Sequence, residues 1–136
     1  MIQVIAGKKG SGKTKRLIDM TNNTAKTSSH DVVFIDDDNR YMFDLRHQIR
    51  FINAGEFLLT NDHMFIGFLC GVMSQNFDVG LISIDAFKKL IKIEVNASSW
   101  FFERLESLSE KNHVDFLISI SEDPDDLPDF IQKYVI

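Results

Sequence analysis

The chain has 136 residues, of which 44% are hydrophobic and 26% charged, and this length and balance suit one globular domain with one core. Its net charge of −5 argues against general affinity for nucleic acids or anionic membranes. No apolar stretch approaches the ~20 residues of a membrane-spanning helix, the start lacks a signal peptide's apolar region, and a single cysteine excludes an internal disulfide. We therefore expect one domain over residues 1–136, in the cytoplasm.

The first half of the chain predicts three strands and one long helix. Residues 2–6 form a short, continuously apolar run, as a strand buried on both faces does. A helical pattern follows from 13 to about 26, and a second buried strand covers 32–35. The segment 39–48 leaves room for a short helix, and 49–53 predicts a third strand.

The second half of the chain alternates helices with strands. Thr60 or Asn61 can cap a helix that ends near Asn76, in which Gly67 and Gly71 are expected to allow close packing. The remaining predicted elements are a strand at 79–84, a short helix at 86–92, a helix capped by Ser98 or Ser99, a strand at 114–120 and a helix that begins at Pro124.

This alternation decides the expected fold class. Strands separated by helical segments favour parallel pairing through right-handed crossovers, with helices packed on both faces of the sheet. The sequence therefore predicts an α/β fold: a three-layer sandwich with a mostly parallel five-stranded sheet.

The segment GKKGSGKT, directly after the first strand, matches the pattern G-x-x-x-x-G-K-[ST]. Glycines let such a loop curl with its amides turned inward, and these amides with the following helix N-terminus form a socket for phosphate oxygens. Lys13 would place a cation by the β- and γ-phosphates, and Thr14 would offer its hydroxyl to a magnesium ion. The predicted phosphate-binding residues are Gly7, Lys8, Lys9, Gly10, Ser11, Gly12, Lys13, Thr14 and Lys15.

On this motif the sequence resembles the P-loop NTPase superfamily, firmly over residues 2–20 and loosely elsewhere through its order of elements. The resemblance implies a nucleoside triphosphate with Mg²⁺, and ATP in particular, because no N-K-x-D run of guanine-selective members is present. The runs VVFIDDDNRY and GLISIDAF also resemble thymidine kinase, although that family's zinc-binding cysteines and lasso segment are absent. The chain is also similar to small bacterial ATP-binding proteins that carry the name of twitching-motility ATPases, and it is far too short to be such a motor.

Acidic residues end two of the predicted strands. Asp85 closes the run LISID, and the Asp36–Asp38 run follows an earlier strand. In the RecA-like branch of the superfamily, one strand follows the phosphate-binding loop in the sequence before the strand that ends in the magnesium-binding aspartate. That intervening strand lies further out in the sheet. This order favours Asp85 as the magnesium residue. The resemblance thus implies Lys13 and Asp85 as catalytic residues, with Thr14 and Asp85 at the metal.

The glutamate that often follows the aspartate in that branch, and positions the attacking water, is missing. Ala86, Phe87 and Lys88 occupy the next positions. The Asp36–Asp38 run could replace the glutamate only where the fold brings it near Asp85. We therefore expect slow hydrolysis, or none, by this chain alone.

Several other polar residues keep two interpretations each. Ser119 or Ser121, at the end of the last strand, could contact a γ-phosphate or simply form a hydrogen bond at a strand end. Arg40 could reach a phosphate in its own subunit or a neighbour's, or be an ordinary surface arginine. The four histidines lack the spacing of metal ligands, so no zinc site is expected.

The leading expectation is an ATP- and Mg²⁺-binding protein that acts as a slow ATPase or as a nucleotide-dependent switch on a partner protein. The sequence does not decide whether the protein forms a homo-oligomer. The alternative is a small-molecule kinase of the nucleoside type, with residues 36–40 and 41–60 forming the acceptor pocket.

Overall fold

One five-stranded sheet organises the protein, in a computed structural model that describes residues 1–136. Every neighbouring pair of strands is parallel, and the order across the sheet is β1-β5-β4-β2-β3. The strands are β1 (Ile2–Ala6), β2 (Asp31–Asp36), β3 (Arg50–Asn53), β4 (Val79–Ile84) and β5 (Asp115–Ile120). The predicted α/β class and all five strands are confirmed, and the sheet is wholly rather than mostly parallel.

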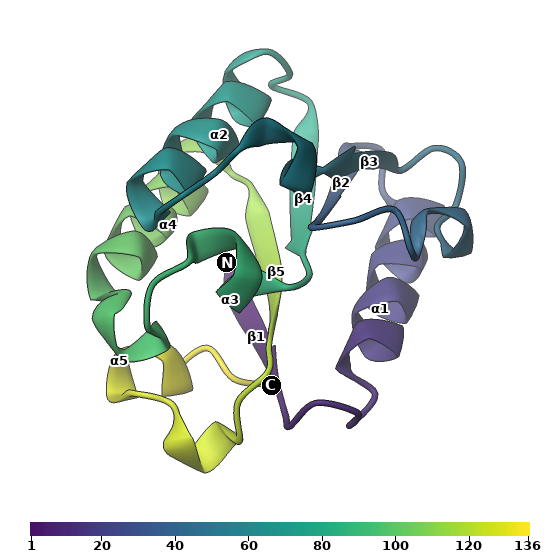
Figure 1. Ribbon diagram of the computed structural model, residues 1–136. Helices are drawn as coiled ribbons and strands as arrows, with labels where there is room; N and C mark the ends of the chain where they lie inside the picture. Colours follow the sequence, from purple (N-terminus) through teal and green to yellow (C-terminus); the bar gives the residue numbers. More distant parts are fainter.

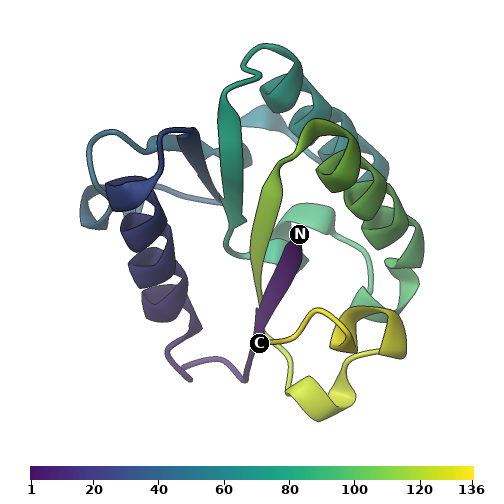
Figure 2. The same cartoon turned by 180° about the vertical axis from the view of Figure 1, so that it is seen from behind.

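Helices cover both faces of the sheet, as Figures 1 and 2 show from opposite sides. The helices are α1 (Lys13–Thr27), α2 (Asp62–Ser74), α3 (Phe87–Ile91), α4 (Ser99–Asn112) and α5 (Asp129–Gln132). In both views α1 stands alone on one side, and α2 and α4 lie together on the other. The connection through α1 runs across the sheet from β1 to β2, whereas the connections through α2 (β3 to β4) and α4 (β4 to β5) run in the opposite direction. Right-handed crossovers in opposite directions place their helices on opposite faces of the sheet.

The core divides into two parts along the sheet. The larger part lies under α2, α3, α4 and α5 and is rich in phenylalanine, and the smaller part lies under α1. Phe101 is fully buried, with its ring centroid 5.6 Å from that of Phe65 and 5.3 Å from that of Phe87. Burying one such side chain contributes roughly 2–3 kcal/mol. None of the helices combines the length and apolar composition that crossing a bilayer requires.

Of three predictions about helix starts and helix packing, the structure confirms one and contradicts two. Asn61 caps α2 as expected, since its side chain accepts the Met64 amide at 2.8 Å. Ser98 precedes α4 but does not cap it, because its hydroxyl donates to the Val95 carbonyl at 2.5 Å. The expected close packing at Gly67 and Gly71 is wrong, because an added Cβ would meet no atom within 4 Å at either position.

The predicted C-terminal helix is broken into two short turns. A 3-10 turn covers Pro124–Asp126, and α5 begins only at Asp129, after Pro128. Proline has no amide to continue the first turn and holds the preceding residue extended, so one continuous helix cannot form. The chain then returns to the sheet, where Val135 pairs in parallel with Val4 on the outer side of β1.

Candidate functional site

The loop between β1 and α1 is curled, and its glycines explain the curl. Gly10 has a φ of +84° and Gly12, directly before α1, a φ of +86°, both in the region that residues with a side chain avoid. Gly7 is needed for space instead, because a Cβ there would collide with the hydroxyl of Ser11. The glycines were predicted to allow this shape, and the structure has it.

Most of the loop's amides have no protein partner. Within the loop only Ser11 donates, to the Lys8 carbonyl at 3.1 Å, and the amide of Gly7 donates across to Ile120 at 3.3 Å. The helical ladder of α1 starts with the Arg16 amide. The amides left without a protein acceptor are those of Lys8, Lys9, Gly10, Gly12, Lys13, Thr14 and Lys15. With the positive end of the α1 dipole, these donors suit a phosphate-like anion.

The two lysines that flank Thr14 differ sharply in position. Lys13 is only 9% exposed and folds back over the loop, where its ammonium donates to the Lys8 carbonyl at 3.1 Å. An ammonium has three donors, so others stay available. Lys15 is exposed and forms an ion pair with Asp19 at 2.9 Å, which raises the pKa of Lys15 through a hydrogen bond and charge attraction. The Lys13 side chain is therefore the cation that belongs to the loop itself.

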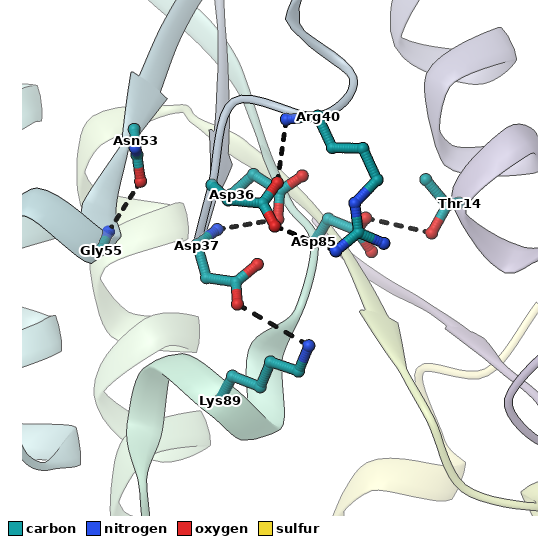
Figure 3. A network of polar contacts seen from close by, with 9 residues as sticks. Thr14, Asp36, Asp37, Arg40, Asn53, Gly55, Asp85 and Lys89 are labelled. Carbon is teal, nitrogen blue, oxygen red and sulfur yellow. Dashed lines mark hydrogen bonds and ion pairs between the residues drawn. The ribbon is translucent and has the colours of Figure 1, made fainter.

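Asp85 lies beside Thr14. It follows β4, is 7% exposed, and its Oδ2 accepts the Thr14 hydroxyl at 3.0 Å (Figure 3). The Ser119 hydroxyl on β5 donates to Oδ1 of the same carboxylate. A hydroxyl and a carboxylate at this spacing are oxygen ligands of the kind that Mg²⁺ prefers, so Thr14 and Asp85 could hold one together. Ser119 orients the carboxylate from behind.

A second buried contact joins the same two elements. The Thr21 hydroxyl of α1 lies 2.7 Å from the Ser83 hydroxyl of β4, and it also donates to the Leu17 carbonyl one helical turn back at 2.7 Å. Since the Thr21 proton goes to that carbonyl, Ser83 donates to Thr21. The helix that begins at the loop is thus bonded to the strand that carries Asp85.

Asp36 lies next to Asp85 because their strands are neighbours. Ile35 pairs with Ile84, and the Asp85 amide donates to the Ile35 carbonyl at 2.9 Å. Asp36 is 2% exposed, its Oδ1 accepts the Asp37 amide at 2.7 Å, and its Oδ2 has no hydrogen-bond partner. Burial above all, together with the neighbouring carboxylates of Asp37 and Asp85, raises the pKa of Asp36 to about 8.

The other two aspartates of this run have basic partners. Asp37 lies 3.8 Å from the Lys89 ammonium (Figure 3). Asp38 pairs with Arg40 at 3.0 Å. The Arg40 amide, which donates to the Asp38 carboxylate, is the main cause of a lowered pKa of Asp38. Arg40 was predicted either to reach a phosphate or to be a surface residue, and in the structure it holds this turn together.

One cleft of about 980 Å³ lies at the carboxyl ends of the strands, the usual ligand position in open parallel sheets, and Thr14, Asp85 and the Asp36–Asp38 run all line it. Of the predicted loop residues, the cleft is lined by Lys9, Gly10, Gly12, Lys13, Thr14 and Lys15. Gly7, Lys8 and Ser11 do not line it. Ser121 lines the cleft and Ser119 does not, which separates the two serine candidates.

Sequence reasoning missed several lining residues. The cleft is also bordered by Asp19, Asn22, Tyr41, Asp44 and Lys89. Two of these had a readable signal, because Lys15, Asp19 and Asn22 recur at helical spacing and so share one face of α1. Tyr41 and Asp44 fall within the segment 41–60 that the kinase alternative assigned to an acceptor pocket, although no pattern singled out these two residues.

No protein-family model matches the chain, and no curated protein matches it in sequence. The case for a function therefore depends on the geometry of the site.

Proposed function

We propose that this chain is a cytoplasmic P-loop protein that binds ATP with Mg²⁺ and works as a slow ATPase or as a nucleotide-dependent switch on a partner protein. One observation carries the proposal. Seven backbone amides of the loop and the first turn of α1 have no protein acceptor, and two of them belong to glycines in left-handed conformation. These amides lie next to the Thr14–Asp85 hydrogen bond, at the border of one cleft. A loop with so many free donors is understandable where an anion supplies the missing acceptors.

The groups present also fit a magnesium ion. Thr14 and Asp85 would hold it, and it would neutralise charge on the β- and γ-phosphates. The strand order supports this assignment, because β2 lies beyond β4 as seen from β1, as the RecA-like resemblance implies.

The experiment compares two lysines of α1 by titration with a labelled, non-hydrolysable ATP analogue and Mg²⁺. Lys13→Ala should abolish measurable binding while circular dichroism stays unchanged. Lys26→Ala removes the same charge from the exposed last turn of the helix and should bind like wild type. Equal affinity of Lys13→Ala and wild type would refute the proposal.

A nucleoside-type kinase remains the second candidate, and the size of the cleft favours it. A volume of about 980 Å³ lies at the upper end for ligand pockets, and much of the lining lies away from the loop. Asn22, Tyr41 and Asp44 could contact an acceptor there. Release of ADP that rises strongly with one added nucleoside would select this function over the first.

A further inference from the structure

One carboxylate of the cleft lacks a partner within the protein. Of all buried side-chain oxygen and nitrogen atoms, only Oδ2 of Asp36 has no hydrogen bond. Asp36 is 2% exposed and lines the cleft, and its other oxygen accepts the Asp37 amide at 2.7 Å. A buried polar atom without a partner costs roughly 1–3 kcal/mol, and more when it is charged. Because the atom belongs to a residue of the cleft, a ligand in the cleft is a natural source of the missing partner.

Two further carboxylates lie beside Asp36. Asp36, Asp37 and Asp38 can each offer one oxygen so that the three oxygens lie within 4.8 Å of one another. Such proximity alone is common among exposed acidic residues, but here it coincides with a buried, unpaired oxygen. The carboxylates of Asp37 and Asp85 also repel a negative charge on Asp36. A positively charged partner therefore fits this position better than a neutral hydrogen-bond donor.

The basic side chains nearby do not fill this position. The Lys89 ammonium lies 3.8 Å from Asp37, beyond hydrogen-bond distance, and Arg40 pairs with Asp38 at 3.0 Å. Neither forms an ion pair with Asp36. The two basic side chains are 68% and 62% exposed, and exposed ion pairs contribute only about 0–1 kcal/mol. A cation that attracts all three carboxylates can therefore displace them at small cost.

The turn that carries these carboxylates is held firmly. Gly55 packs so closely against the Asp37 carbonyl that a Cβ at position 55 would collide with that oxygen. The Asn53 side chain accepts the Gly55 amide at 3.0 Å and fixes this contact (Figure 3). The Arg40 amide donates to the Asp38 carboxylate at 2.9 Å and closes the turn. Such support suits a metal site, because its ligands must stay near their places when the ion is absent.

We propose that the Asp36–Asp38 run binds a divalent cation of the Mg²⁺ class through its three carboxylates. This cation is separate from the one assigned to Thr14 and Asp85. Carboxylate oxygens are the ligands that Mg²⁺ and Mn²⁺ prefer, and water completes the coordination of such ions. The cation would provide the partner that Oδ2 of Asp36 lacks and would offset the repulsion within the run. The site uses no atom of a nucleotide, so this inference goes beyond the proposed function and does not depend on it.

The test is a titration of the protein with Mn²⁺ in the absence of nucleotide, followed by the electron paramagnetic resonance signal of free Mn²⁺. The titration is run at about pH 8, because at lower pH the proton on Asp36 competes with the cation. Wild type should bind Mn²⁺ at this site, and added Mg²⁺ should displace it. Asp36→Asn and Asp37→Asn should each lower the affinity at least about tenfold, since even residues that only orient metal ligands change it about 10- to 100-fold.

Three variants serve as controls. Asp19→Asn removes a carboxylate from the same cleft, where it pairs with Lys15, and should stay within about threefold of wild type. Thr14→Ala removes a ligand of the other cation without a change of charge, and it should also stay within about threefold. Lys89→Ala removes the ammonium that competes for Asp37 and should bind Mn²⁺ about two- to fivefold more tightly.

Each other outcome overturns the inference. Absence of Mn²⁺ binding at millimolar concentrations excludes the site, as does unchanged affinity in Asp36→Asn or Asp37→Asn. An equal loss in Asp19→Asn would assign the effect to the overall charge of the cleft. A loss in Thr14→Ala alone would place the ion at the site predicted from the sequence. Binding by Lys89→Ala that is no tighter than that of wild type would exclude Asp37 as a ligand.

Two features keep the result decisive. If circular dichroism shows that Asp36→Asn does not fold, Asp37→Asn alone decides under the same limits, because its side chain is less buried. The titration contains no nucleotide, so its failure leaves the proposed function untouched, and the titration with the ATP analogue tests that function separately.

Discussion

Replacing Asp36 by asparagine should stabilise the protein in alkaline solution, whatever the protein binds. The folded-state pKa of Asp36 is about 8, against an ordinary value of 3.8. Between these values the folded chain keeps a proton that the unfolded chain has released. Wild-type stability therefore falls as the pH rises through this window, and the loss is complete only above the folded pKa. Asparagine does not titrate, so the variant lacks this loss.

The magnitude follows from the slope. Each pH unit inside the window costs about 1.4 kcal/mol, so from pH 6 to pH 9 the wild type should lose at most about 2.7 kcal/mol relative to the variant. Water in the open cleft and rotation of the carboxylate reduce that figure, and we expect about 1–2 kcal/mol. At pH 6 the two proteins should differ little, because asparagine and a protonated carboxyl each place an unpaired donor near the same point.

Urea unfolding followed by circular dichroism at pH 6 and pH 9 measures this difference. The histidines titrate in both proteins and cancel in the comparison. Asp38→Asn is the control, because the pKa of Asp38 is lowered and that carboxylate is ionised throughout the range, so its difference from wild type should not change. A stability difference for Asp36→Asn that is equal at both pH values, or that shrinks at pH 9, would refute the account of a buried, unpaired carboxylate.

Two further variants test the loop and the core by the same unfolding measurement. Gly12→Ala forces a side chain to a φ of +86° and should lower the unfolding free energy by about 1–2 kcal/mol. Gly67→Ala lies in α2 with open space around it and should raise the unfolding free energy by roughly 0.5–1 kcal/mol. Equal effects of the two variants would contradict the strain at Gly12. Phe101→Ala should lower the unfolding free energy by about 3–5 kcal/mol, because it removes the side chain at the centre of the phenylalanine cluster. Phe77 is 96% exposed, so Phe77→Ala should stay within about 0.5 kcal/mol of wild type. A loss under about 1 kcal/mol for Phe101→Ala would count against the packing described.

The sequence was sufficient for the parts of the fold that depend on local patterns. Mainly apolar runs located the five strands to within one residue, because strands covered by helices carry mostly apolar side chains. The glycine loop was predictable for a similar reason, since Gly10 and Gly12 occupy backbone conformations that few other residues tolerate. The pairing of Thr14 with Asp85 also followed, because parallel strands bring their carboxyl ends to one edge.

The remaining features depend on contacts that no local pattern records. The C-terminal helix was predicted from apolar spacing that Pro128 interrupts. The relation of Asp36 to Asp85 depends on β2 lying beside β4, and the sequence left the two in competition for one role. In the structure they are neighbours with different partners, so the competition disappears. Ser119 likewise could be assigned to Asp85 only after β5 was placed between β1 and β4.

The buried hydroxyl pair of Thr21 and Ser83 limits how this molecule could transmit a signal. Moving α1 away from the sheet would leave the Ser83 hydroxyl without a partner in an apolar interior, which costs roughly 1–3 kcal/mol, whereas Thr21 would keep its bond to the Leu17 carbonyl. The helix and β4 should therefore move as one rigid piece. Movement coupled to the cleft is therefore expected at its opposite wall, where Arg40 is exposed and its guanidinium lies 5.6 Å from the ring centroid of the half-buried Tyr41.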